Sequence, residues 1–306
     1  MDLSSINPAL LLASLIVAST PILLAALGEL VVERAGVLNL GVEGMMITGA
    51  ICGFAFVVNT GSPVVGFAMA ALGGAGLAFL FALLTQLALA NQVASGLALT
   101  LFGLGLSALL GQDYIGIKPP STPPINFGPL SNIPFFGEVV FSHDLMVYLA
   151  LALVVLTYIV INKTRVGLIL RAVGENHDAA HALGYKVVRV RIAAILFGGA
   201  CAGLGGAYLS LVRVPQWTEG MTAGAGWIAL ALVVFAGWRT GRVLIGAWLF
   251  GGISVLQLNL QAAGVPIPVE YLTMSPYVIT ILVLVLISAD KSRAPGSLGR
   301  VFHASG

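Results

Sequence analysis

The chain has 306 residues, of which 58% are hydrophobic and 8% are charged, and its formal net charge is +2. Soluble domains carry about a quarter charged residues, so this composition excludes a soluble globular protein, which could not cover its surface with so few polar side chains. The 38 glycines lie mostly within long apolar runs, which is typical of helices that pack closely in lipid. The sequence therefore predicts an all-α integral membrane protein.

Nine apolar segments are candidates for crossing a bilayer, which takes about 20 residues. They predict a polytopic bundle of about nine transmembrane helices in a single domain over residues 1–306, with approximate bounds 8–28, 36–58, 63–90, 93–111, 144–162, 191–213, 223–238, 243–263 and 270–289. The seventh segment is short and follows Gly220, Gly224 and Gly226, so we expect a broken or re-entrant helix there.

The second predicted span opens with GVLNLGVEGMM, which runs from Gly36 to Met46 and places a carboxylate in an apolar run. Residues four apart share one face of a helix, so Asn39 and Glu43 are expected to project together, with Met46 one turn further along. A charged carboxylate facing lipid would cost about 2.5–3.5 kcal/mol or more, so we expect Glu43 to face the bundle interior, to be neutral, or to pair with Arg34. Three roles stay open for Glu43: lining a solute path together with Asn39 and Met46, tying two helices together, or lying at the membrane interface.

The segment 112–143 contains six prolines, which disfavour a long helix and predict an extended, semi-rigid loop on the external face. A passive connector and a docking surface both fit this composition.

The lysines and arginines are divided unevenly between the two sides of such a bundle. With nine crossings, twelve of the fourteen fall on one side, mainly in the segment 163–190 and in the tail 290–306. Because basic residues are retained in the cytoplasm, we expect both segments to be cytoplasmic and the N-terminus to lie outside.

The cytoplasmic segment 163–190 contains the signals of a short helix of about two turns. Asn176 or Asp178 can cap its start, and Gly184 can supply the left-handed position that ends it. Between them a narrow apolar stripe follows helical spacing: Ala179, Ala180 and Leu183. Such a helix could rest on anionic headgroups or bind a groove of another protein, and the small size of the stripe favours the protein groove.

A resemblance to a known family begins at the same place. The pattern D-A-A-x-x-x-G, from Asp178 to Gly184, resembles the cytoplasmic loop signature of ABC-importer permeases, usually written E-A-A-x-x-x-G. The surrounding TRVGLILRAVGEN is similar to that loop in permeases for branched-chain amino acids, ribose-type sugars and nucleosides. Two further blocks resemble the simple-sugar and nucleoside branch: GELVVERAGVLNLGVEGMMITGA from Gly28 and AGWIALALVVFAGWRTGRVLIGAWLFG from Ala225.

The resemblance covers roughly residues 20 to 290. The chain departs from the family pattern at His177, where proline is common, and at His181, where a basic residue is frequent. Neither change removes the helix signals of this loop.

The resemblance implies a permease subunit of an ATP-driven ABC importer that moves nucleosides or simple sugars inward by alternating access. The implied partners are ABC ATPase subunits, a second permease subunit and an extracytoplasmic substrate-binding protein in the bacterial cytoplasmic (inner) membrane, with no nucleic acid among them. The chain has no G-x-x-x-x-G-K-[ST] phosphate-binding loop, so ATP and magnesium are expected on the partner ATPase. We expect the chain itself to be no enzyme and to hold no cofactor, no catalytic residue and no metal site.

On this interpretation, the short cytoplasmic helix couples the permease to the ATPase by entering a groove on it, through Asn176, Asp178, Ala179, Ala180, Leu183 and Gly184. The alternative function is an ion-coupled secondary transporter of a small polar solute, in which Glu43 would be the ionisable group at depth. That alternative would leave the capped cytoplasmic helix without a purpose.

Overall fold

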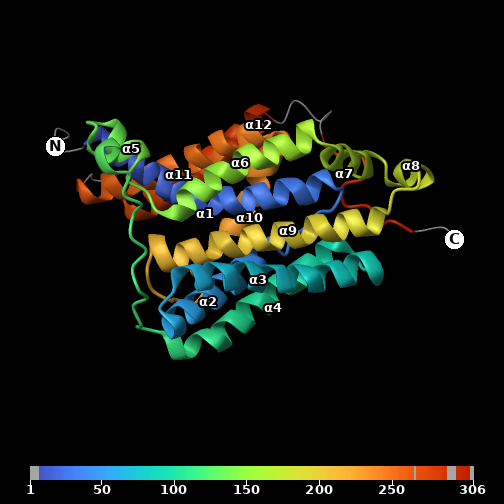
Figure 1. Ribbon diagram of the computed structural model, residues 1–306, viewed down its shortest axis with the longest axis horizontal. Coiled ribbons are helices and arrows are strands. Elements are labelled where there is room, and N and C mark those ends of the chain that lie inside the picture. The colour runs from blue at the N-terminus through green and yellow to red at the C-terminus, as the bar shows by residue number, and fades with distance from the viewer. Residues whose placement is uncertain (1–6, 265–266, 288–293, 304–306) are drawn as a thin grey trace.

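The computed structural model describes residues 7–264, 267–287 and 294–303 (Figure 1). Within them the chain is helical, and a single bridge between Ile115 and Trp217 is the one pairing of extended backbone. The long helices are α1 (Pro8–Arg34), α2 (Val42–Thr60), α3 (Pro63–Ala82), α4 (Gln92–Gly111), α6 (Leu145–Lys163), α9 (Val187–Tyr208), α11 (Thr240–Ala262) and α12 (Val269–Ile287). The shorter α-helices are α5 (Phe136–Val140), α7 (Arg165–Glu175), α8 (His177–Ala182) and α10 (Ala225–Phe235).

Seven helices in the described residues are long and apolar enough to cross a membrane: α1, α2, α3, α4, α6, α9 and α11. Two of them are extended by π-helical turns, α3 by Leu83–Leu87 and α9 by Leu209–Arg213. The seventh predicted span contains α10, whose 11 residues are too few to cross a bilayer. The ninth predicted span coincides with α12, and its last two residues, 288 and 289, lie outside the described residues.

The second membrane helix begins at Val42, so the prediction of a helix from residue 36 is wrong for residues 36–41. The chain turns at Gly36, whose φ of +83° lies in the left-handed region that glycine adopts without strain. We call residues 35–41 the α1–α2 loop.

The α1–α2 loop finds its hydrogen-bond partners in side chains rather than in a helix. The Leu38 N–H donates to Oε1 of Gln92 in α4 at 2.8 Å, and the Gly41 N–H donates to Oδ1 of Asn39 at 3.0 Å. Backbone without helical bonds is tolerated at membrane depth when it is buried in protein and its polar groups are satisfied. These bonds explain why the expected helix is replaced by a loop.

The core of the bundle is formed by α1, α2, α3 and α9, whose backbones approach one another closely. A Cβ on Gly49 of α2 would overlap Gly203 of α9, and a Cβ on Gly206 of α9 would overlap the carbonyl oxygen of Met46. This packing requires small residues at the contacts, as is usual for helices in lipid.

The predicted external loop 112–143 and the predicted cytoplasmic segment 163–190 lie at opposite ends of the bundle (Figure 1). Figure 1 shows the N-terminus and α5 at one end, and α7, α8 and the C-terminal segment at the other. We call these the α5 end and the α8 end. The predicted loop 112–143 is mostly irregular but contains 3₁₀ turns at Gln112–Tyr114 and Gly128–Asn132 as well as α5.

Candidate functional site

A buried carboxylate joins α2 to the start of α10. Glu43 lies in the first turn of α2 and is 3% exposed. It accepts three hydrogen bonds from the segment that opens α10: from Thr222 Oγ1 at 2.6 Å, from the Gly224 N–H at 2.9 Å and from the Gly226 N–H at 2.7 Å. We call Glu43 and these three partners the Glu43 joint.

The start of α10 explains why an acid is placed at this joint. The first N–H groups of a helix have no partner within the helix, and their aligned dipoles attract negative charge. The chain enters α10 at Gly224, whose φ is +84°, and the helix ends three residues before Trp238. Helix α10 is therefore a half-helix whose N-terminus is held inside the protein by a carboxylate.

Of the alternatives left open for Glu43, the structure supports a side chain that faces the bundle interior, and it does not show the pairing with Arg34. Arg34 closes α1 and donates from Nε and Nη2 to the carbonyl oxygen of Trp238, at 3.2 and 2.7 Å. The guanidinium therefore holds the other end of the α10 segment, and Glu43 relies on main-chain and hydroxyl donors.

A cavity of about 760 Å³ opens beside the joint, toward the α5 end. Its walls come from α1, α5, α10, α11 and α12, from the π-helical turn after α9, and from the chain that follows α5 and that precedes α10; most of the lining is apolar. Nine of the lining residues have polar side chains: Ser14, Glu138, Ser142, His143, Arg213, Thr222, Ser254, Gln257 and Tyr277. Thr222 both lines the cavity and bonds to Glu43, so the joint forms part of the cavity wall.

Behind the joint, two more carboxylates lie one turn apart in α1. Glu29 is 1% exposed and accepts bonds from the Asn39 N–H at 3.3 Å and from Asn39 Nδ2 at 3.4 Å. Glu33 is fully buried and accepts from Trp238 Nε1 at 2.5 Å, while its Oε1 has no hydrogen-bond partner in the described residues. In the same described part of the chain, no group of three or more His, Cys, Asp or Glu side chains is placed to hold a metal ion.

Sequence reasoning missed this layer of carboxylates. The energetic argument applied to Glu43 holds equally for Glu29 and Glu33, which stand four residues apart within an apolar span and so share one face. The four-residue spacing of Glu29 and Glu33 was the sequence signal that could have predicted a pair of buried carboxylates. The partner Trp238 carried no local signal, because it is distant in sequence.

The structure separates the three residues predicted to share a path face. Asn39 belongs to the α1–α2 loop and points to Glu29, so the expected common helical face with Glu43 is wrong. Met46 is fully buried and packs near Gly205 of α9. None of the three is among the residues that line the cavity, and their part in a solute path stays a prediction.

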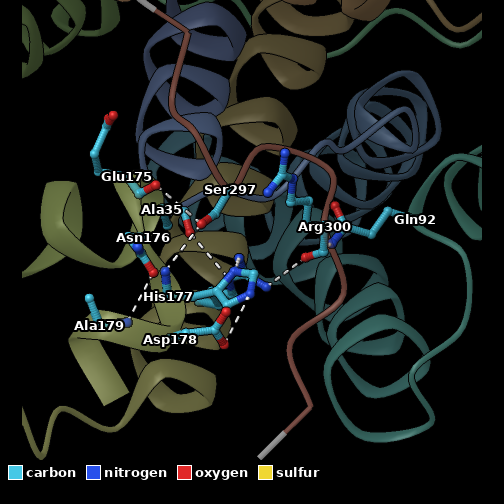
Figure 2. Close-up of polar contacts among 10 residues, drawn as sticks. Ala35, Gln92, Glu175, Asn176, His177, Asp178, Ala179, Ser297 and Arg300 are labelled. Atoms are coloured by element: carbon cyan, nitrogen blue, oxygen red, sulfur yellow. Dashed lines mark hydrogen bonds and ion pairs between the residues drawn. The ribbon is translucent and has the colours of Figure 1, made fainter. Parts of the chain in front are cut away.

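The short capped helix predicted at the other end is α8. The Asn176 side chain accepts from the Ala179 N–H at 2.9 Å, as Figure 2 shows, so Asn176 rather than Asp178 is the cap. Asp178 instead lies 3.5 Å from Nε2 of His177. Gly184 has a φ of +86° and follows the helix end, as predicted.

The predicted apolar stripe of α8 is partly exposed and partly buried. Ala179 and Leu183 are exposed, Leu183 to 76%. Ala180 is 2% exposed and packs in a small cluster with other residues of this end: Val173, Val187 and Phe302. The face of α8 that is free to meet another molecule therefore contains Ala179 and Leu183.

Comparison with known proteins gives consistent matches along most of the chain. The family described as the permease component of branched-chain amino acid transport systems matches residues 11–287. A putative glucose ABC transporter permease of Haloferax volcanii is 44% identical over 256 residues, covering 82% of this chain and 78% of that protein. A nucleoside ABC transporter permease of Lactococcus lactis subsp. cremoris is 34% identical over 304 residues, covering 95% of each chain. A guanosine ABC transporter permease of Bacillus subtilis is 32% identical over 315 aligned positions, covering 97% of this chain and 98% of that protein. No solved structure matches the chain significantly.

Proposed function

Because the chain belongs to the family of permease components of branched-chain amino acid transport systems, we propose that it moves a nucleoside or a simple sugar through the membrane. It is a multi-pass membrane protein and the permease subunit of an ABC importer, and it is not itself an enzyme. ATP hydrolysis belongs to a separate subunit of such a system.

The solute class rests on the relatives and on the chemistry of the cavity. The three relatives are named for glucose, nucleosides and guanosine, which are uncharged ring compounds rich in hydroxyl groups. The cavity of about 760 Å³ is of the size that holds small organic ligands. It offers mainly apolar walls with hydroxyl, amide and phenol groups, among them Thr222, Gln257 and Tyr277. The lining also contains Glu138 and Arg213, whose charged groups can accept hydrogen bonds from hydroxyls or donate to them, so the cavity suits a solute with one apolar face and several hydroxyls.

Alternating access would pass through the Glu43 joint. The joint holds the start of α10 at the inner boundary of the cavity, so tilting α10 away from Glu43 would extend the cavity toward the α8 end. Asn39 and Met46 act on this path from behind its wall, Asn39 through Glu29 and Met46 through the contact of α2 with α9. Glu43 thereby acts on the solute through α10.

The proposed orientation places the α8 end in the cytoplasm and the α5 end outside, with nine crossings in total. Because α10 alone is too short to cross, the seventh crossing would combine α10 with the irregular segment 214–224 that precedes it. The orientation is supported by the basic residues of 163–190, which lie at the α8 end, and by the position of 112–143 at the opposite end. In this orientation the cavity opens outward, where an extracytoplasmic binding protein would deliver the solute.

The proposed partners act at the two ends of the bundle. A second permease subunit would complete the path in the bacterial cytoplasmic membrane. ATPase subunits, which bind ATP and magnesium, would receive α8 in a groove through its exposed residues Ala179 and Leu183, with Asn176 and Gly184 fixing the two ends of the helix. Asp178 and the buried Ala180 would hold its shape.

Reconstitution of the complete importer in vesicles tests this function. Uptake of a radiolabelled nucleoside and of a hexose should depend on ATP and on the binding protein, and should survive collapse of the proton and sodium gradients. Ala13→Phe places a ring in the cavity, whereas Leu12→Phe on the neighbouring position of α1 changes a residue outside the lining. We expect the Ala13 variant to lose uptake and to keep its basal ATP hydrolysis, and the Leu12 variant to transport normally.

Uptake that stops when the gradient collapses while ATP is present would support the secondary transporter instead. Equal uptake by both α1 variants would remove the cavity from the path.

A further inference from the structure

The C-terminal segment 294–303, which we call the tail, crosses the α8 end of the bundle and contacts the α1–α2 loop, α4, α7, α8 and α9 there. Its central contact is with Arg191 of α9, whose side chain is fully buried. Arg191 donates from Nε to the carbonyl oxygen of Ala35 at 3.2 Å and from Nη1 to that of Arg300 at 3.0 Å. Its Nη2 lies 3.1 Å from Nδ1 of His177. One side chain therefore binds the α1–α2 loop, the tail and α8 together.

The charge of Arg191 makes these contacts interdependent. Among the described residues no carboxylate lies within 4 Å of it, so the buried guanidinium is stabilised by carbonyl oxygens and a ring nitrogen. An arginine always donates, so Nδ1 of His177 must be the unprotonated nitrogen. The planar fork fixes the directions of its donors, and displacement of one partner would leave part of a buried cation without a bond.

Ser297 makes a second set of bonds to the junction of α7 and α8, seen in Figure 2. Its N–H donates to the carbonyl oxygen of Gly174 at 2.8 Å. Its hydroxyl accepts from the His177 N–H at 3.1 Å and donates to the carbonyl oxygen of Glu175 at 3.4 Å. The tail thus satisfies a free N–H at the start of α8 and bonds the end of α7 at the same point.

Phe302 packs the tail against the body of α8. It is 5% exposed, and its ring meets the rings of His177 and His181 edge to face, each at a centroid distance of 5.3 Å. His177 and His181 are the two residues at which the sequence departs from the family pattern, and both contact the Phe302 ring of the tail.

The same tail is bonded to the α1–α2 loop. The Gly299 N–H donates to the carbonyl oxygen of Gly36 at 3.3 Å. Around Gly36 the space is filled: a Cβ there would lie 3.0 Å from Nη2 of Arg191, 3.2 Å from the Cα of Gly174 and 3.3 Å from the Cβ of Ser297. The loop, the end of α7, the tail and α9 meet at this residue.

A further link passes through Gln92 of α4. Its Nε2 donates to the carbonyl oxygen of Arg300 at 3.4 Å, and its Oε1 accepts from the Leu38 N–H at 2.8 Å (Figure 2 shows Gln92 beside Arg300). Two side chains, from α4 and α9, therefore bond both the tail and the α1–α2 loop.

We propose that the tail and Arg191 form a clamp that makes α8 and the α1–α2 loop move as one body, so that displacement of α8 by the ATPase reaches Glu43. This proposal rests on the proposed function. The α1–α2 loop leads directly into α2, and Glu43 is the second residue of α2. Arg191 is a positioning residue in this role, because it acts on the path through the loop.

The test compares variants of the clamp in the reconstituted importer. Ser297→Ala removes the hydroxyl bonds to the end of α7 and the start of α8. Phe302→Ala removes the ring contacts, and Arg191→Lys keeps the charge but not the planar fork of donors. Matched controls lie in the same tail: Arg300→Ala leaves the carbonyl oxygen that Arg191 and Gln92 bind, and His303→Ala changes an exposed side chain. For each variant, assembly with the ATPase, basal ATP hydrolysis and solute transported per ATP are measured.

We expect the three clamp variants to assemble and to hydrolyse ATP at the basal rate, with transport per ATP reduced about five- to tenfold, the scale of losing one buried hydrogen bond or ring contact. The two control variants should keep the parental ratio. A parental ratio in all three clamp variants would overturn the proposal, and so would a loss of transport that only follows loss of assembly. Failure of the proposed function has a different signature: the parental importer itself would show no ATP-dependent uptake.

Discussion

Replacing Glu43 by leucine should release the half-helix α10 from α2. The substitution removes the acceptor of three hydrogen bonds at once. The Thr222 hydroxyl can rotate toward another acceptor, but the N–H groups of Gly224 and Gly226 have fixed directions. Each buried N–H left without a partner costs about 1–3 kcal/mol, so the two together cost about 2–6 kcal/mol. That is a large share of the stability of an ordinary domain, about 5–15 kcal/mol.

Glu43→Gln offers the graded comparison. The amide oxygen can still accept from one or two of the donors, and its NH₂ group can donate to the Thr222 hydroxyl, but it cannot accept from the remaining N–H. We therefore expect the glutamine variant to lose about 1–3 kcal/mol, roughly half of the loss in the leucine variant. The thermal unfolding midpoint of each purified variant in detergent measures its stability. Uptake by the importer assembled with each variant in vesicles measures its transport activity.

The predicted order of both stability and uptake is parental, then Glu43→Gln, then Glu43→Leu. If the leucine variant unfolds at the parental midpoint and transports normally, the joint has no mechanical role. If it loses uptake while its midpoint and assembly are unchanged, Glu43 contacts the solute directly.

Four further outcomes follow from the same geometry. Gly226→Ala should resemble Glu43→Leu, because a Cβ there would lie 2.6 Å from the Cα of Glu43, whereas Gly241→Ala in α11 meets nothing within 4 Å and serves as the control in the same midpoint and uptake assays. Leu183→Asp, on the exposed face of α8, should change the free energy of unfolding by no more than about 0.5 kcal/mol and abolish ATP-driven uptake. Coprecipitation of the ATPase and a transport assay measure the loss of binding and of uptake. Burial, and next the neighbouring guanidinium of Arg191, lower the pKa of His177 below its usual 6.5. The unfolded chain therefore takes up a proton at a higher pH than the folded chain, so the contribution of His177 to the free energy of unfolding is complete above pH 6.5 and declines as the pH falls below it. A series of unfolding midpoints measured against pH should be flatter for His177→Gln. The chain inserted into vesicles without partners should show no uptake driven by ATP, and uptake by the chain alone would contradict the importer.

Local signals in the sequence were sufficient for α8. Its cap Asn176 and its terminal Gly184 stand within nine residues of each other, and both act as predicted because capping is a contact between near neighbours. The burial of Ala180 could not be read in the same way, because its contact Phe302 lies far along the chain. Helical spacing gives the faces of a helix but does not say what covers each of them.

The start of α2 shows the opposite case, in which a tertiary contact overrides a local pattern. Residues 36–46 have helical spacing, yet the first six residues form a loop because Gln92 and Glu29 satisfy its peptide and amide groups. The glycines of 36–41 lower the helix propensity of this segment. The hydrogen bonds to Gln92 and Glu29 satisfy the polar groups of the loop, so it is stable while buried in the bundle. The broken character of the seventh span, by contrast, was predictable, since Gly220 and Gly224 precede the short α10 and Gly226 lies in its first turn.

These two irregular segments explain the cost of a carboxylate inside an apolar bundle. A helix that starts inside an apolar bundle exposes N–H groups that need acceptors from the protein, and a neutral side-chain oxygen is a weaker acceptor than a carboxylate. A carboxylate accepts several bonds at once, and the dipole of the helix stabilises its charge. Glu43 is placed where α10 begins, and it is itself in the first turn of α2, so the positive ends of two helices converge on it. The acid is therefore stabilised by the same interruption of the helices through which we propose that the solute passes.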